Sequence, residues 1–364
     1  MTHRLARHDD RHDSRCSIVP PYLLERLASL DDPGFVRAAA AARHSLVRRT
    51  VHTRPSGMRS DAAATLTTER PSDPARLVRA VFDARGTEDL PGVPVRSEGD
   101  EETGDPATDE AYAGLGATHA LFLEAFERRS IDDAGLPLEA TVHFGEAYDN
   151  AFWDGACMVF GDGDGQVFDR FTRSLSVIGH ELSHGVVQYS ANFVYEGQSG
   201  ALNESVADVF GALVEQYRSR QSVEEASWLI GVGLFTDEVE GVAIRSLAEP
   251  GSAYDDDVLG KDPQPGHMRD YIDTVEDNGG VHLNSGIPNK AFHVAATTIG
   301  GYAWEGAGRV WYHAVAHGDL SASATFAQFA TQTIASAEEL FGAESRERAA
   351  VAEAWETVGV SPDA

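Results

Sequence analysis

The sequence predicts an α+β protein in which a strand-rich N-terminal half is followed by an all-helical C-terminal half. Up to about residue 160, short runs of β-branched and aromatic residues alternate with turn signals. After about residue 173, apolar residues at helical spacing dominate instead. The chain has 364 residues, 42% of them hydrophobic, so it is long enough for two lobes that each bury a core.

Residues 1–50 are predicted to form a short unit of their own, the leader. Pro20-Pro21 favours an extended polyproline II stretch, and leucines at helical spacing followed by an alanine run to Ala42 predict a helix after it. The run from Arg43 to Arg49 is basic in an otherwise acidic chain. Residues 54–70 are rich in Ser, Thr, Pro, Gly and Arg, and predict a processing region or a flexible connection.

Residues 51–190 are predicted to be the strand-rich lobe, which includes a final helix from about Arg173. Strands are expected at 77–82, 93–95, 140–144 and 157–160. A helix around residues 112–126 carries His119 on its apolar face, where packing is favoured over a functional role. The glycine-aspartate run at 161–165 lacks EF-hand spacing, so a tight turn is favoured over a calcium loop.

Residues 191–364 are predicted to be the helical lobe. Its helices are expected at 199–217, 289–298, 304–317, 323–340 and 345–356.

The sequence His180-Glu181-Leu182-Ser183-His184 predicts a metal site on the helix between the two halves. Positions i and i+4 of a helix share one face, so both imidazoles can reach one ion. Catalytic zinc takes three protein ligands, and Glu204, 24 residues after His180, is the candidate for the third. Asp208, one turn later, can accept the spare N–H of a ligating histidine. Two surface histidines on an ordinary helix are the alternative, which the second acidic helix disfavours.

These residues, together with Tyr195 and the run G-A-L-N-E-S at 200–205, resemble the thermolysin family of metallopeptidases. The run N-A-F-W-D-G at 150–155, the run G-D-G-D-G at 161–165 and the run D-N-G-G-V-H-L-N-S-G at 277–286 resemble the same family. The similarity extends from Val81 to Val360, about three quarters of the chain. It implies a two-lobed fold with a cleft across the metal-binding helix. The leader resembles the short propeptide of protealysin-like members of the family.

The resemblance assigns roles to further residues. Glu181 would take a proton from the attacking water and pass it to the leaving amine. His282 and Tyr195 would stabilise the oxyanion that forms on the substrate. Asp277 would orient His282. Asn150, Ala151 and Arg245 would bind the substrate backbone. A pocket for the residue after the cut would be lined by Phe168, Phe171, Val177 and Ile244. All four are apolar, so a bulky hydrophobic residue after the cut is expected, although each could equally be core.

Some positions depart from the family pattern. Ser176 stands where thermolysin has an aspartate, and Ser227, Leu229 and Val232 replace an acidic cluster that follows Glu215. We therefore expect the buried double-calcium site to be lost, and with it a requirement for calcium.

The predicted function is a zinc-dependent metalloendopeptidase with one catalytic zinc ion, made as a precursor that cuts itself between about Arg43 and Gly57. Its expected partners are protein or peptide substrates and its own propeptide. The rival hypotheses are a non-catalytic zinc-stabilised binding protein and a hydrolase of small amides. Cys16 could be a fourth zinc ligand, since a thiolate binds zinc well, but a small buried residue beside the prolines is favoured.

The formal charge of −29 argues against nucleic acid and anionic membranes as partners, because both would repel the chain. The first 16 residues are charged and lack a signal-peptide core. The chain contains no run of 18 consecutive apolar residues, so no insertion into a membrane is expected. We expect synthesis in the cytoplasm and, for a secreted enzyme, export by a non-classical route.

Overall fold

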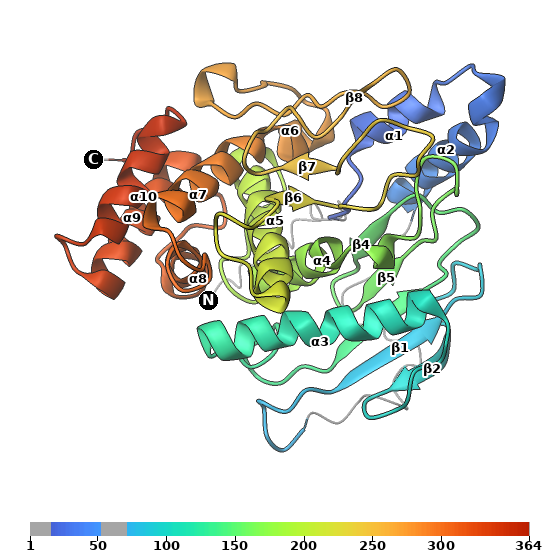
Figure 1. The fold of residues 1–364 in the computed structure, drawn as a ribbon, viewed down its shortest axis with the longest axis horizontal. Helices are drawn as coiled ribbons and strands as arrows, with labels where there is room; N and C mark the ends of the chain where they lie inside the picture. The colour runs from blue at the N-terminus through green and yellow to red at the C-terminus, as the bar shows by residue number, and fades with distance from the viewer. Residues whose placement is uncertain (1–15, 52–70, 364) are drawn as a thin grey trace, which may run out of the picture.

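A computed structural model of the chain places a five-stranded sheet and one long helix in one lobe and a group of helices in the other (Figure 1). The structure describes residues 16–51 and 71–363, with the side chains of residues 48–51 left undescribed. The predicted processing segment at 54–70 and the charged residues 1–15 lie outside the described residues. The α+β fold class is confirmed, with the strands in the N-terminal half.

The sheet has the order β2-β1-β3-β5-β4, which leaves β4 at one edge. Its strands are β1 (Arg79–Asp83), β2 (Val93–Ser97), β3 (Leu138–Val142), β4 (Ala151–Trp153) and β5 (Met158–Phe160). The pairs β1–β3 and β3–β5 are parallel, and the two outer pairs are antiparallel. The residue pattern alone did not predict β4, because three residues are too few to show an alternating pattern; an edge strand at Asn150 was expected only from the family resemblance.

Three long helices join the sheet to the rest of the molecule. They are α3 (Pro106–Phe126), α4 (Leu175–Gln188) and α5 (Gly197–Ser219). Helix α3 contacts β1, β3 and α4, and α4 packs along α5 in the middle of the molecule (Figure 1). Their close approach depends on Gly179 and Gly211, since a Cβ at Gly211 would lie 2.5 Å from the Ser176 carbonyl oxygen and one at Gly179 would lie 3.0 Å from Val214. The two helices therefore lie near enough to share a site.

The C-terminal half is helical apart from two short two-stranded pairings. Its helices are α6 (Asp277–Asn284), α7 (Gly286–Ile299), α8 (Ala307–His317), α9 (Phe326–Phe341) and α10 (Arg346–Thr357). The pairings are β6 (Leu229–Ile230) with β7 (Arg245–Ser246) and β8 (Asp255–Asp256) with β9 (Gly260–Lys261). Short 3-10 turns occupy η3 (Phe171–Arg173) and η4 (Met268–Asp270). The five predicted helices of this half are present, each within a few residues of its expected bounds.

Helix α6 contains His282, although the glycines that precede this residue would suggest a loop. The start of α6 has left-handed φ values at Asn278, Gly279 and Gly280. Glycine adopts this conformation without a steric penalty, so the same residues that suggest a loop form the tight entrance to the helix.

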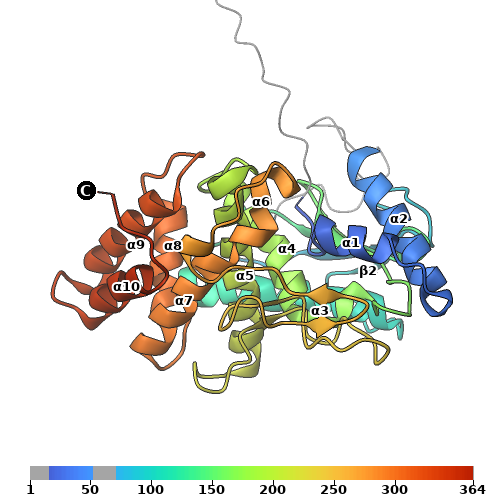
Figure 2. The same ribbon diagram turned by 90° about the horizontal axis from the view of Figure 1, so that it is seen from above.

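The described part of the leader forms α1 (Pro21–Ala28), η1 (Pro33–Phe35) and α2 (Val36–Val51), which lie beside the catalytic lobes (Figure 2). The expected extended stretch ends at Pro20, with φ −64° and ψ 149°, and Pro21 begins α1. Extension through both prolines was therefore wrong: proline suits the first turn of a helix, where no N–H partner is needed.

Polar contacts fix the leader helices to both lobes. Arg26 donates to the carbonyls of Asp257 and Val258, at 2.6 and 3.1 Å. On α2, Ser45 Oγ accepts the Asp149 N–H at 3.0 Å. Among the residues described, no helix is both long enough and apolar enough to cross a membrane.

Candidate metal centre and substrate cleft

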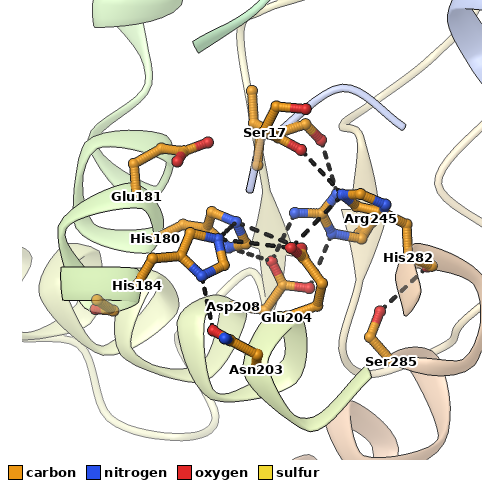
Figure 3. Close-up of polar contacts among 12 residues, drawn as sticks. Ser17, His180, Glu181, His184, Asn203, Glu204, Asp208, Arg245, His282 and Ser285 are labelled. Atoms are coloured by element: carbon orange, nitrogen blue, oxygen red, sulfur yellow. Dashed lines mark hydrogen bonds and ion pairs between the residues drawn. The ribbon is translucent and has the colours of Figure 1, made fainter. Parts of the chain in front are cut away.

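The two histidines of the H-E-x-x-H sequence and Glu204 converge on one point between α4 and α5 (Figure 3). The Nε2 atoms of His180 and His184 lie 3.1 Å apart. Glu204 places Oε2 3.6 Å from His180 Nε2 and Oε1 3.5 Å from His184 Nε2. The three residues are almost completely excluded from solvent.

The second ring nitrogen of each histidine, Nδ1, faces an oxygen acceptor. His180 Nδ1 lies 2.8 Å from Asp208 Oδ1, and His184 Nδ1 lies 2.9 Å from Asn203 Oδ1. Each Nδ1 must therefore carry the proton, which leaves a lone pair on each Nε2. Asp208 was expected in this place from the sequence and Asn203 was not, although Asn203 directly precedes Glu204 on the same helix.

This arrangement fits a cation. Two imidazole lone pairs 3.1 Å apart and a neighbouring carboxylate repel one another when nothing positive lies between them. Glu204 Oε2 is buried and has no hydrogen-bond partner among the described residues. Ligand atoms about 2.1 Å from one tetrahedral ion lie roughly 3.4 Å apart, close to the separations in this site. The donor set of two imidazoles and one carboxylate is the set that catalytic zinc prefers.

Burial sets the charge states of the site. It lowers the pKa of both His180 and His184 to about 4, so both rings are neutral at physiological pH, as metal ligands must be. Burial also raises the pKa of Glu181 well above its ordinary value, and the negative charge of Glu204 acts in the same direction.

Asp208 and Arg245 form the buried ion pair behind the metal ligands. Burial alone would raise the pKa of Asp208, but Arg245 and His180 outweigh it and hold this pKa below its usual range. Arg245 donates to both carboxylate oxygens, at 2.8 Å each, and Asn289 donates to Oδ2 at 2.9 Å. The pair fixes the carboxylate that in turn holds His180.

His282, Tyr195 and Asp277 form a second group of polar side chains next to Glu204. Asp277 Oδ1 lies 2.6 Å from His282 Nδ1, and Oδ2 accepts the His282 backbone N–H at 2.8 Å. The Tyr195 hydroxyl lies 3.3 Å from His282 Nε2 and donates to Glu204. Gln264, which the sequence analysis missed, donates to the His282 carbonyl at 2.6 Å.

The residues expected to bind substrate lie along one side of the site. Asn150 precedes β4, Ala151 begins it, and Arg245 begins β7. The Trp153 backbone N–H on β4 donates to Glu181 Oε2 at 3.0 Å and so orients the carboxylate of the metal helix. The expected pocket residues are fully buried and belong to the main hydrophobic core, which extends over both lobes and includes the leader's Ile18: Phe168, Phe171, Val177 and Ile244.

Cys16 differs from the favoured expectation of a small buried residue, because it is partly exposed. Its sulfur lies within 4.8 Å of ligand atoms of both His184 and Glu204. It lines a cavity of about 450 Å³ together with His184, Tyr195 and Trp153. The contact joins residues far apart in the sequence, so no local pattern could predict it.

The fold and the site define a metal-dependent hydrolase of the H-E-x-x-H class. A family profile described as the thermolysin metallopeptidase catalytic domain matches residues 72–188, and one described as the thermolysin metallopeptidase alpha-helical domain matches residues 191–360. The chain therefore belongs to the thermolysin family of metallopeptidases.

Known relatives are similar along most or nearly all of the chain. An extracellular metalloprotease of Pectobacterium carotovorum is 46% identical over 345 residues, which cover 95% of this chain and 96% of the relative. A thermolysin of Alicyclobacillus acidocaldarius is 35% identical over 289 residues, 77% of this chain and 50% of the relative. The solved structure of the precursor of protealysin from Serratia proteamaculans superimposes with a TM-score of 0.85 at 46% identity, covering 95% of this chain and 100% of the other. The chain is thus a protealysin-like zinc metalloendopeptidase with a propeptide.

Proposed function

We propose that this chain is the latent precursor of an endopeptidase that uses a single zinc ion and cuts before bulky hydrophobic residues. The observation that carries the proposal is the convergence of His180, His184 and Glu204 on one buried point, with Glu181 and His282 beside it. Zinc, when bound, lowers the pKa of a water molecule and polarises a carbonyl group.

Glu181 is the proton-transfer residue in this proposal. A raised pKa suits a carboxylate that takes a proton from the attacking water and passes it to the leaving amine. Its Oε2 is held by the Trp153 N–H, so the carboxylate is fixed relative to β4, where the substrate would lie.

His282 is proposed to stabilise the negative charge that develops on the substrate's carbonyl oxygen. Its Nδ1 faces Asp277, which fixes the ring, and its Nε2 faces a backbone carbonyl oxygen, the position from which it would donate to a substrate's carbonyl oxygen. Tyr195 has its hydroxyl beside the same Nε2 and is proposed as a second donor.

Substrate recognition is proposed to combine backbone and apolar contacts. Asn150, Ala151 and Arg245 offer donors and acceptors to an extended peptide along β4. Phe168, Phe171, Val177 and Ile244, all buried and apolar, are proposed to line the pocket that accepts a bulky hydrophobic residue after the cut.

A calcium requirement is not expected. Ser176 Oγ accepts the Gly231 N–H at 3.1 Å, so the position is part of a hydrogen-bonded turn instead of a carboxylate cluster. Glu215 is partly buried, and burial raises its pKa, which disfavours the charge that calcium needs.

Maturation is proposed to use the chain's own active site, with a cut between about Arg43 and Gly57 that frees the cleft. Synthesis is proposed to occur in the cytoplasm, with export by a non-classical route. Fractionation of expressing cells and their medium, with a cytoplasmic marker enzyme as a lysis control, tests the second point.

One experiment tests the main proposal. The matured enzyme is incubated with an unfolded protein, with and without a zinc chelator, and the products are identified by mass spectrometry. We expect cuts before Leu, Ile, Val and Phe that the chelator abolishes and added zinc restores. Cleavage of small amides alone, or zinc binding without any cleavage, would favour one of the two rival functions.

A further inference from the structure

Helix α8, in the helical lobe, repeats the histidine spacing of the metal helix. His313 and His317 are four residues apart, as the two histidines of α4 are, so both rings lie on one face of α8. Their ring centroids lie 5.3 Å apart, compared with 4.7 Å for the pair on α4. Helix α8 lies beside α9, and the end of α3 approaches it (Figure 1). A pair of imidazoles at this spacing can hold one metal ion between them.

Contacts from α9 orient the ring of His313. Its Nδ1 lies 3.0 Å from the hydroxyl oxygen of Ser336, which is completely buried. Its Nε2 lies 3.8 Å from Glu339 Oε2. When Nδ1 carries the proton and donates it to Ser336, a lone pair remains on Nε2, on the side of the carboxylate. A neighbouring oxygen fixes the tautomer of a metal-ligating histidine in this way.

A cavity of about 190 Å³ opens beside the two rings. Its wall contains both histidines and Glu127, the C-cap residue of α3. His317 is the last residue of α8. The C-terminal end of a helix carries a partial negative charge from its unpaired carbonyl groups, which favours a cation. Two such ends and a carboxylate therefore border the space beside the histidines.

The charges around His313 suit a metal site of moderate strength. Burial lowers the pKa of His313; the charge of Glu339 opposes this effect and His317 adds to it. The ring is therefore neutral at pH 7, as a ligand must be. Arg309, one turn before His313, also borders the cavity and opposes a cation, with its guanidinium carbon 5.9 Å from the centroid of Phe341. A metal ion should bind here less tightly than in the catalytic centre, where three buried ligands surround it.

We propose that His313, His317 and Glu339 form a second metal site, which takes zinc or a similar divalent transition-metal ion and links α8 to α9. Imidazole suits zinc, nickel and copper, and a carboxylate can complete the ligand set. The Glu339 side chain is 73% exposed, so it can close on an ion held by the two rings. The inference does not rest on the proposed peptidase mechanism, because the ion binds outside the catalytic centre. Its expected effect is to stabilise the helical lobe.

The main test counts the zinc bound to the full chain with Glu181→Gln, which prevents self-cleavage. The protein is dialysed at nanomolar and then at micromolar free zinc, and its metal content is measured by elemental mass spectrometry. The catalytic ion should be present at both concentrations. At the higher concentration we expect one further zinc per chain. Adding His317→Ala should remove this further zinc and leave the catalytic ion, and its retention would overturn the proposal.

Other histidines of the chain provide the controls. His293→Ala removes a histidine from α7 in the same lobe, where no histidine lies one turn away, and it should retain the further zinc. The first 15 residues contain His3, His8 and His12. Any zinc bound by these three would appear equally in every variant, so the difference between a variant and its parent isolates the site on α8.

Changes at three neighbours should alter the affinity in different directions. Glu339→Gln should weaken the binding of the further zinc and Arg309→Gln should strengthen it, each by about 3–10-fold, because the first removes a negative charge and the second a positive one. Ser336→Ala should weaken it by about 10-fold or more, because it removes the partner of the ligating ring. Titration in competition with a zinc-binding dye measures the dissociation constants. Equal constants for Glu339→Gln and its parent would overturn the carboxylate ligand.

Thermal unfolding gives a second readout that needs no activity. An ion that binds only the folded chain stabilises it, so zinc at about 100 times its dissociation constant for the second site should raise Tm by about 2–4 °C. The rise should disappear with His317→Ala and, independently, with His313→Ala. Circular dichroism checks that both variants are folded. A rise of the parent's size in either variant would overturn the ligand set.

Two measurements separate this site from other uses of the same histidines. Size-exclusion chromatography should give one elution volume at nanomolar and at micromolar zinc, because all three ligands belong to one chain. A zinc-dependent increase in size that His317→Ala abolishes would show instead that two chains share the ion. The matured His317→Ala enzyme should digest an unfolded protein at the wild-type rate. A lower rate in folded, zinc-loaded variant would overturn the separation of this site from the catalytic centre.

Discussion

Two clusters in this molecule combine histidine with carboxylates and reach opposite charge states. In the metal centre, His180 lies between Asp208 and Glu204, and burial lowers its pKa to about 4. In the second cluster, His143 lies between Asp162, 2.8 Å from Nδ1, and Asp105, 3.2 Å from Nε2. The hydrogen bond to Asp162 raises the pKa of His143 to about 9, because burial is too weak to outweigh it.

The difference shows that neighbouring carboxylates alone do not decide the charge of a histidine. His143 is 26% exposed and its two partners are 39% and 43% exposed, whereas His180 and Glu204 are completely buried. Water stabilises the charged form of His143, and its absence favours the neutral form of His180. The first cluster can therefore hold a metal, and the second joins the start of α3 to the end of β3 as an ion pair.

The comparison is tested most strongly at Glu181, beside the buried cluster. Glu181→Gln should lower proteolysis by several orders of magnitude, because the amide cannot take the proton of the attacking water. Metal analysis should still find one zinc per chain, and circular dichroism should be unchanged. Near-normal activity in zinc-replete protein would overturn the proposed mechanism. The inactive variant should also remain full-length, whereas trimming of a highly purified sample would exclude maturation by its own active site.

His282→Ala should reduce kcat by about 10²–10³-fold, as removal of a single transition-state donor usually does. KM should change little, since the donor acts mainly on the charge that develops during reaction. Steady-state kinetics on a peptide substrate measures both constants. A change confined to KM would assign His282 to ground-state binding.

Asp208→Asn compares the two clusters directly. Loss of this carboxylate leaves Arg245 buried and unpaired, which typically costs about 3–5 kcal/mol of stability, and weakens zinc binding by about 10–100-fold through His180. The matched change Asp162→Asn in the exposed cluster should cost no more than about 1 kcal/mol and leave zinc affinity unaltered. Denaturant unfolding and competition with a zinc-binding dye measure the two effects. Equal costs at both positions would show that burial does not distinguish the clusters.

Sequence reasoning succeeded where function depends on local spacing. His180 and His184 share a helix face, and Glu204 and Asp208 share another, so the sequence alone suffices to group them. It failed where geometry depends on distant segments. Cys16 meets His184 only because the leader adds to the edge of β4, a strand too short to be recognised. The cluster around His143 likewise joins three separate segments and has no motif.

His143→Asn tests the exposed cluster with a residue that tolerates the left-handed φ of 55° at this position. The folded pKa is raised above the unfolded value, so the stabilisation is complete below about pH 6.5 and is lost as the pH rises through about 9. Allowing for solvent screening, we expect a loss of about 1 kcal/mol at pH 6. Unfolding by denaturant at pH 6, 8 and 10 should show wild type and variant converging at pH 10, with unchanged proteolysis at pH 7. A constant difference would mean that the ion pair contributes nothing.

Calcium should have the smallest effect. Bound calcium stabilises a protein only where a site with several charged oxygens exists in the folded state. At the positions where the family carries acidic residues, this chain has Ser176, whose hydroxyl accepts a backbone N–H, and the apolar Leu229 and Val232. Burial also raises the pKa of Glu215, so a single carboxyl group that resists ionisation stands in place of a charged cluster.

Millimolar calcium should therefore leave Tm unchanged in thermal scans of zinc-loaded, Glu181→Gln precursor, with magnesium as the control cation. A calcium-specific rise in Tm would reveal other ligands. If Glu215→Gln abolished that rise, the partly buried carboxylate of Glu215 would be shown to take part in calcium binding.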